Sequence, residues 1–289
     1  MKTFDFVKVG VCLKKAGNGG LKVNIVFWSE EDGCGMTSGM AAIASACADL
    51  WNMKVFLMQS NNQEGDLYQK LGTGIKNISL VREDADGRRD AWEVLTKLAV
   101  SGMLTKERLL GSMVPVARGQ MYYLPQGEYK KREKYSQAVK TGIRRVADFT
   151  RQIADLTFID CGSGKDEISD LLLSQADVTV AMISQERQNL DAFFQNRHVF
   201  QGNVIYLINQ YHQESVYNKK NIHRLYRIYE EELAVIPHNP VFRQVSEKGK
   251  TERFIRRHRQ CRNFDGQNDF MQELIKTTCL ILKAAGMVV

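Results

Sequence analysis

Short apolar runs that alternate with helical patterns constrain the fold of this chain more than any other feature of its sequence. The runs are nearly continuous in Val, Ile, Leu, Met and Phe, which is typical of strands buried on both faces of a parallel sheet. We expect strands at 23–28, 55–58, 121–124, 156–159, 178–183, 204–208 and 233–236. Helical patterns lie between most of them, at 91–100, 137–154, 166–173, 186–194 and 221–229.

This alternation predicts an α/β fold of three layers, with helices on both faces of a mostly parallel, twisted sheet. Two alternating runs, 4–13 and 22–27, flank Ala-Gly-Asn-Gly-Gly and indicate a β-hairpin. We therefore expect an N-terminal antiparallel neighbour for the strand at 22–27. The chain has four prolines and no Pro/Gly/Ser-rich linker, so we interpret residues 1–289 as a single domain.

The composition of the chain is typical of a cytoplasmic protein and not of a membrane or secreted one. No apolar run approaches the length of a transmembrane helix, and the first ten residues lack the apolar stretch of a signal peptide. The six cysteines are scattered, without a C-x-x-C pair, as in reduced cytoplasmic proteins. The formal charge of +7 is compatible with an acidic partner, although moderate positive charge mostly serves solubility.

Residues 29–39 read S-E-E-D-G-C-G-M-T-S-G and lie between a predicted strand and a run of small residues that begins a helix. A strand, a glycine turn and a helix N-terminus form the setting of a phosphate-binding loop. Gly33 and Gly35 would let backbone N–H groups converge on an anion. The candidate nucleotide-binding residues are Gly33, Cys34, Gly35, Met36, Thr37, Ser38, Asn209 and Pro237.

Thr37 occupies the place of the magnesium-binding hydroxyl in such a loop, and Asp160 ends a buried strand. Together they are a candidate Mg²⁺ site, although Asp160 could equally cap a helix or accept from a backbone amide. Asn209 ends another strand and could read a purine edge or close a turn. Residues 236–240 offer backbone for a base to lie against.

The order of these motifs over residues 22–245 resembles the MinD/ParA superfamily of deviant Walker-type ATPases. The likeness is carried by 31–38, Ala41-Ala42-Ile43-Ala44, Thr157-Phe158-Ile159-Asp160, Gln175-Ala176-Asp177 and Asn209. The phrase Met121-Tyr122-Tyr123-Leu124-Pro125 is similar to a segment of the TadZ/CpaE-type pilus-localisation branch. The resemblance implies a P-loop fold, ATP and magnesium as cofactors, a homodimer, and a role in positioning a larger machine.

Three departures from the family pattern bear on catalysis. Glu31 and Met36 stand where the family has its two lysines, and Asn61 stands where the family has the acid implied to orient the attacking water. A pair of unit charges about 4 Å apart is worth about 4 kcal/mol at an effective dielectric of about 20. The helix dipole stabilises a bound anion by only about 0.3–1 kcal/mol at exposed sites, which does not replace the lost lysine charges. The sequence therefore predicts weak or absent nucleotide binding and little hydrolysis.

Two further segments are open to more than one interpretation. The basic stretch 243–262 includes F-I-R-R-H-R-Q-C-R and is either a solvated helix face or a contact for nucleic acid, acidic lipid or an acidic protein. The apolar residues of 270–282 have helical spacing and more simply close the core than lie on a membrane. The five histidines show no zinc-ligand spacing.

The leading hypothesis is a degenerate MinD/ParA-like protein, a pseudo-ATPase that acts in localisation or assembly of a pilus or secretion apparatus. It would be cytoplasmic, or peripheral at the membrane or cell pole. One alternative is an active ATPase in partitioning or cell-surface assembly, with a lysine from elsewhere such as Lys165. Another is a DNA-binding partition protein without catalysis, which rests only on the basic stretches.

Overall fold

A computed structural model describes residues 22–60, 66–72, 91–117, 120–125, 132–195, 200, 202–259 and 266–287. Eight strands in these ranges form one sheet in the order β3-β4-β2-β5-β1-β6-β7-β8. The strands are β1 (Val23–Ser29), β2 (Val55–Gln59), β3 (Val114–Ala117), β4 (Met121–Tyr123), β5 (Leu156–Ser163), β6 (Val178–Ile183), β7 (Asn203–Tyr211) and β8 (Leu233–Pro237). Neighbouring strands are parallel except for β3 and β4. The predicted mostly parallel α/β sheet is confirmed.

Strand β3 was not predicted from the sequence. It is four residues long and contains Pro115, which has no backbone N–H to donate. Proline is tolerated on an edge strand, and β3 is the edge of the sheet. The strand pairs antiparallel with β4, which follows it closely in the sequence, as in the pairing of Val114 with Tyr123. Pro115 and the shift of register between Pro115 and Ala117 interrupt the regular alternation that would have marked the strand.

The predicted antiparallel neighbour of β1 is wrong. β5 and β6 pair with β1 on its two edges, and both are parallel to it. A strand has only two hydrogen-bonding edges, so no edge of β1 is left for a hairpin partner. Residues 4–13, the other arm of the predicted hairpin, lie outside the described residues.

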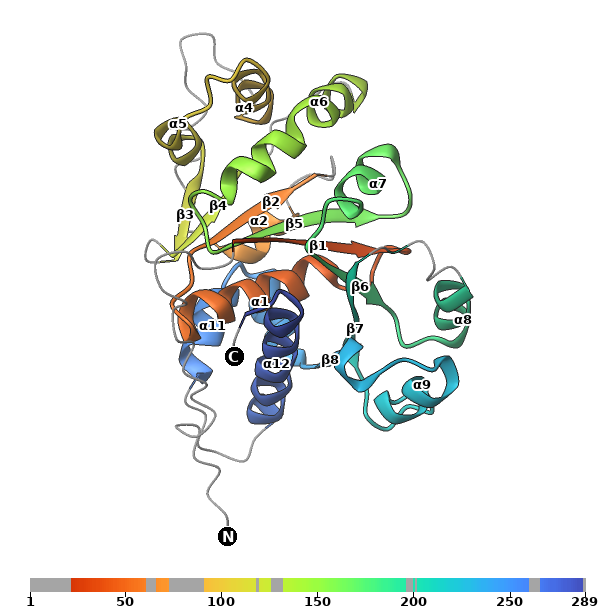
Figure 1. Cartoon of the computed structure of the whole chain (residues 1–289). Coiled ribbons are helices and arrows are strands. Elements are labelled where there is room, and N and C mark those ends of the chain that lie inside the picture. Colours follow the sequence, from red (N-terminus) through yellow and green to blue (C-terminus); the bar gives the residue numbers. More distant parts are fainter. Residues whose placement is uncertain are drawn as a thin grey trace.

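Helices cover both faces of the sheet, as predicted (Figure 1). On one face lie α1 (Met36–Leu50), α2 (Asp66–Leu71), α10 (Pro240–Glu247), α11 (Thr251–His258) and α12 (Gly266–Ala284). On the other face lie α4 (Ala91–Val100), α5 (Lys106–Gly111), α6 (Arg132–Thr150), α7 (Glu167–Leu173), α8 (Arg187–Gln195) and α9 (Lys219–Tyr226), with the 3-10 turn η3 (Glu230–Glu232) before β8. None of the helices in the described ranges is both long enough and apolar enough to span a bilayer.

Each face of the sheet has its own apolar core because successive side chains of a strand point to opposite faces. In β1, Ile25 and Phe27 pack with α1 and α12, whereas Val26 and Trp28 pack with the helices of the other face. The terminal helix α12 has Phe270, Leu274 and Ile281 buried in the first of these cores. The prediction that this helix closes the core is confirmed.

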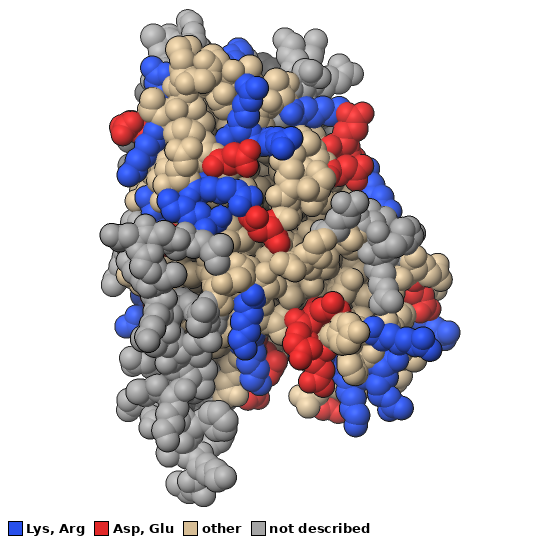
Figure 2. Space-filling view, in the orientation of Figure 1, with Lys and Arg blue, Asp and Glu red and all other residues tan. Residues whose placement is uncertain are grey.

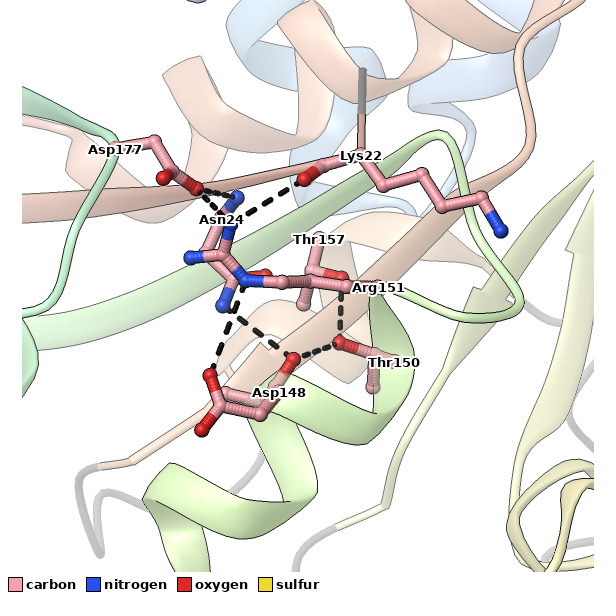
Figure 3. A network of polar contacts seen from close by, with 8 residues as sticks. Lys22, Asn24, Asp148, Thr150, Arg151, Thr157 and Asp177 are labelled. Atoms are coloured by element: carbon pink, nitrogen blue, oxygen red, sulfur yellow. Dashed lines mark hydrogen bonds and ion pairs between the residues drawn. The ribbon is translucent and has the colours of Figure 1, made fainter. Parts of the chain in front are cut away.

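A polar network fixes the amino ends of β1, β5 and β6 (Figure 3). Asp177, just before β6, accepts the backbone N–H of Asn24 at 2.7 Å and pairs with Arg151 at 2.7 Å. Arg151 also donates to the carbonyl oxygen of Lys22 at 3.3 Å. The network lies at the end of β1 away from the glycine turn, so it supports the central strand without touching the candidate site.

Candidate functional site

The candidate site lies where β1 ends, at the point where the strand order reverses between β5 on one side and β6 on the other. Ligands of open α/β sheets bind at such points, outside the carboxyl ends of the strands. A cavity of about 460 Å³ opens there. All eight candidate nucleotide-binding residues line it: Gly33, Cys34, Gly35, Met36, Thr37, Ser38, Asn209 and Pro237.

The turn between β1 and α1 has the backbone of a phosphate-binding loop. Gly33 has φ +85° and Gly35 has φ +73°, both in the left-handed region that favours glycine. A Cβ on Gly35 would lie 2.6 Å from Nδ2 of Asn209, whereas a Cβ on Gly33 would meet nothing within 4 Å. Gly35 directly precedes α1, so the positive end of the helix dipole faces the cavity.

Thr37 and Asp160 meet, as the sequence predicted. Oγ1 of Thr37 donates to Oδ2 of Asp160 at 3.0 Å, and Oδ1 of Asp160 accepts from the backbone N–H of Gly162 at 3.0 Å. Asp160 is fully buried within β5, which continues to Ser163, and Asn209 lies within β7, which continues to Tyr211. The prediction that these two residues end their strands is therefore wrong. A hydroxyl and a carboxylate are hard oxygen donors of the kind that Mg²⁺ prefers, so these residues fit a magnesium ion. Within the described ranges no group of three or more His, Cys, Asp or Glu residues could hold a metal ion by itself.

Asn209 ties β7 to the loop. Its Nδ2 donates to the carbonyl oxygens of Cys34 at 3.1 Å and Gly35 at 2.8 Å. These two bonds occupy the amide hydrogens of Asn209, which would otherwise be available to donate to an acceptor atom of a base. Base reading by Asn209 stays a prediction, and loop closure is the role that the geometry displays.

Met36 is the residue at the position where the sequence resemblance predicts a lysine. Its side chain is only 8% exposed and belongs to the core between the sheet and α1, although it also borders the cavity. A thioether in this place contributes packing and no positive charge. Next to it, Oγ of Ser38 donates back to the carbonyl oxygen of Gly35 at 2.9 Å, which closes the first turn of α1.

The carboxylate of Asp32 has a partner within the protein, whereas an oxygen of the Glu31 carboxylate has none among the described residues. Asp32 accepts a hydrogen bond from Oγ of Ser163, and the backbone oxygen of Glu31 accepts from Oγ of Ser29 at 2.9 Å. Oε1 of Glu31 is buried, with no hydrogen-bond partner among the described residues. Both acids line the cavity, where they oppose the binding of a polyanion. Asn61, the third departure from the family pattern, lies outside the described residues.

Two cationic residues that sequence reasoning missed also line the cavity. Lys70 comes from α2 and Arg243 from α10. Nε of Arg243 pairs with Glu247 at 3.2 Å, and both side chains are largely exposed. No local signal marks either residue, because only the packing of α2 and α10 brings them to the phosphate loop. Lys165, the lysine proposed from the sequence, is exposed and is not among the residues that line the cavity.

His238 stands at the same rim, stacked on His212 with ring centroids 5.0 Å apart. Burial lowers the pKa of His238, and the neighbouring His212 and Arg243 lower it further. A depressed pKa keeps the imidazole neutral near pH 7. His238 therefore adds no lasting positive charge to the cavity.

The basic stretch 243–262 forms α10, α11 and the turn between them, and residues 260–262 lie outside the described residues. Phe254 and Ile255 are buried. Three of its arginines pair with acids: Arg243 with Glu247, Arg256 with Glu252, and Arg259 with Asp49. These contacts favour the interpretation of a solvated helix face that packs on α1.

No family model matches the sequence, and no curated protein matches it. Solved structures do match its fold. A ParA family ATPase from Chlorobium tepidum aligns with a TM-score of 0.66 at 14% identity, over 89% of this chain and 98% of that one. MinD of Pyrococcus horikoshii, solved with Mg-ADP, gives 0.63 at 16% identity over 91% and 97%. The MinC:MinD complex of Aquifex aeolicus gives 0.60 at 18% over 90% and 96%.

This chain has the MinD/ParA fold. The likeness spans nearly the whole length of each neighbour, and the fold expected from the order of the motifs is confirmed. In this fold the glycine turn after β1 lies at the end of the central strand, and its role as a phosphate-binding loop stays a prediction. The TadZ/CpaE-type branch stays a prediction.

Proposed function

We propose that this chain is a degenerate MinD/ParA-like protein that helps to localise or assemble a membrane-associated machine, such as a pilus or secretion apparatus. The observation that carries the proposal is the fate of the two lysine positions. Met36 is buried in the core, and Glu31 adds a carboxylate to the wall of the cavity. The scaffold of the fold is kept while the charges that hold and activate phosphate are replaced.

The cavity still fits a weakly bound nucleotide. The backbone N–H groups around Gly33 and Gly35 and the N-terminus of α1 would hold phosphate oxygens, and Thr37 with Asp160 would hold magnesium. Magnesium, when bound, would neutralise part of the phosphate charge. Against this, the described residues that line the cavity include three carboxylates and two cationic side chains. Weak binding with little hydrolysis follows from that balance.

A homodimer with a protein partner is the form in which we expect the chain to act. MinD of Aquifex aeolicus, which has the same fold, was solved in a complex with MinC. Without hydrolysis to drive a conformational cycle, the chain would act on a partner only by binding it through its surface. We place it in the cytoplasm or at the inner side of a membrane or cell pole.

The first test is catalytic. Purified full-length protein should release phosphate from ATP with magnesium no faster than the background, because Met36 cannot stabilise charge on the transferring phosphoryl group. Asp160→Ala is the control that removes the candidate magnesium ligand. Turnover that is present in the wild type and absent in Asp160→Ala would overturn the proposal.

The second test is cellular. A fluorescent fusion at native expression should give fixed foci, and Thr37→Ala, which removes the candidate magnesium hydroxyl, should leave the foci unchanged. A diffuse wild-type signal would contradict a role in localisation. Foci that are lost only in Thr37→Ala would instead indicate a nucleotide-driven cycle.

An active ATPase is the second candidate, and one observation favours it. Lys70 and Arg243 bring positive charge to the cavity from α2 and α10, in place of the missing lysines. If they act on phosphate, Lys70→Ala and Arg243→Ala should each lower ATP turnover. Lys165→Ala should not, because Lys165 is not part of the cavity wall. A DNA-binding partition protein, the third hypothesis, rests on basic residues such as those of 243–262, where three of the five described arginines pair with acids.

A further inference from the structure

An apolar tip flanked by cations lies on the far layer of the molecule from the phosphate loop, at the turn between α4 and α5. Val100 ends α4 with 44% of its surface exposed, and Met103 in the turn is 57% exposed. Between them stand Ser101 and Gly102, and Gly102 has φ +71° with nothing within 4 Å of an added Cβ. The turn therefore presents its apolar side chains to solvent.

Two arginines hold this turn from neighbouring helices. Nη1 of Arg145, on α6, donates to the carbonyl oxygen of Val100 at 2.9 Å. Nη1 of Arg108, on α5, donates to the carbonyl oxygen of Met103 at 2.9 Å. Both arginines are exposed. Each guanidinium is thus fixed beside an exposed apolar side chain, and its further N–H groups have no acceptor among the described residues.

Two exposed lysines extend the positive charge. Lys97 lies one turn before the end of α4, and Lys106 begins α5. The acid among these residues is Glu107, in the first turn of α5. We name the set the α4–α5 patch; it comprises Lys97, Val100, Met103, Lys106, Arg108 and Arg145. In Figure 2 blue side chains stand on both sides of an uncharged strip in the upper part, where α4, α5 and α6 lie, with a smaller number of red side chains among them.

We propose that the α4–α5 patch docks on an anionic lipid surface. Exposed apolar side chains flanked by Lys and Arg match the boundary between headgroups and acyl chains, where apolar groups insert and cations meet lipid phosphates. A nucleic-acid backbone would use the cations and leave Val100 and Met103 without a partner. The inference rests on the membrane-associated part of the proposed function and needs no nucleotide.

A second exposed apolar region, around α9, provides the matched control. Val216 is 74% exposed and Leu225 is 61% exposed, so both are more accessible than the tip of the α4–α5 patch. Exposed Lys220 and Arg224 lie on α9, but the three consecutive acids of η3 follow that helix. An anionic surface should therefore be attracted less strongly to α9.

The experiment is flotation of full-length protein with phosphatidylcholine vesicles, with and without phosphatidylglycerol. Wild type should float only with the anionic vesicles, and less at high salt because the charges are screened. Val100→Ser with Met103→Ser should reduce partitioning about tenfold, since both side chains lose apolar surface to bury. One basic charge contributes about fivefold to partitioning, and Lys106→Glu reverses that charge, so it should reduce partitioning more than fivefold. Val216→Ser with Leu225→Ser should leave it unchanged.

Failure to float wild type, or an equal loss in the α9 control pair, would overturn the proposal. Binding to duplex DNA that Lys106→Glu abolishes, without binding to vesicles, would also overturn it and assign the patch to nucleic acid. Because all four substituted apolar positions are exposed, thermal unfolding should be nearly unchanged and would expose any misfolded variant. If the protein forms fixed foci in cells but does not float with vesicles, the lipid-binding role of the α4–α5 patch is wrong while the localisation role still holds.

Discussion

Asp177 shows how a single side chain can secure the central strand of the sheet. Its carboxylate accepts the backbone N–H of Asn24 and pairs with Arg151, while its own backbone N–H donates to the carbonyl oxygen of Asn24 at 3.0 Å. In the sequence, Asp177 was only part of a motif shared with the MinD/ParA pattern. The structure gives it a stabilising role at the end of the sheet opposite the cavity.

Asp177→Ala should lower the free energy of unfolding by about 2–3 kcal/mol, because a charge-assisted hydrogen bond to a backbone N–H is lost with the ion pair. Asp148→Ala is the control, since Asp148 contacts the same Arg151 at 3.9 Å and is largely exposed. Its change should stay below about 0.5 kcal/mol. Denaturant unfolding measures both. Equal decreases in the free energy of unfolding for the two variants would show that Asp177 does not stabilise the fold more than an exposed acid does.

The loop charges allow a second test at the residue scale. Met36→Lys combined with Glu31→Lys should raise the affinity for MgATP about tenfold or more, because the glycine turn and Thr37 remain in place. A lysine stem can follow the buried path of Met36 and bring its ammonium group to the cavity. Calorimetric titration decides the outcome.

Glu30→Lys is the control for that experiment, because Glu30 is not among the residues that line the cavity. It should change the affinity much less than the double variant does. No gain in the double variant would mean that the turn after β1 is not a phosphate cradle.

At the scale of elements, the turn between β1 and α1 depends on contacts from β7. Asn209 donates to two loop carbonyls, and its amide lies where a Cβ on Gly35 would be. Gly33 shares the left-handed backbone but faces open space. Substitution of each glycine in turn therefore distinguishes the cost of backbone strain from the cost of losing the contact with β7.

Gly33→Ala should cost about 1–2 kcal/mol of stability, from the left-handed conformation alone. Gly35→Ala should cost clearly more, about 2–4 kcal/mol, because the new methyl group also displaces the amide of Asn209 from the loop carbonyls. Thermal or denaturant unfolding of both variants gives the difference. Indistinguishable losses would contradict a role for Asn209 in holding the loop.

At the scale of the whole molecule, the charge reversal at Glu31 bears on assembly. The MinD/ParA resemblance implies a dimer in which each signature lysine reaches the phosphate of the facing subunit, and Glu31 cannot make that contact. We predict a homodimer that forms without nucleotide and is mildly sensitive to salt. Exposed ion pairs contribute only about 0–1 kcal/mol each, so buried apolar surface must provide the affinity.

Light scattering after gel filtration, with and without ATP, measures this assembly. The dimer should be present in both runs and weaken only slightly as salt rises. A chain that is a monomer at tens of micromolar and dimerises only on addition of ATP would contradict the prediction.

The sequence by itself determined the α/β class, seven of the eight strands and the glycine turn at Gly33 and Gly35. These follow from local causes: buried parallel strands need continuous apolar runs, and left-handed backbone favours glycine. The approach of Thr37 to Asp160 also followed, because parallel strands bring their carboxyl ends to one edge of a sheet.

Only the tertiary structure decided the rest. Strand β3 exists through pairing with β4, and β1 lacks the expected hairpin partner because β5 and β6 take both of its edges. Lys70 and Arg243 reach the cavity from helices that no motif connects to the loop. Whether Met36 would face phosphate or core depended on how α1 packs. The β3–β4 pairing is local but irregular, with a shift of register between Pro115 and Ala117. The other outcomes depend on contacts between distant residues, which periodicity and local propensity do not encode.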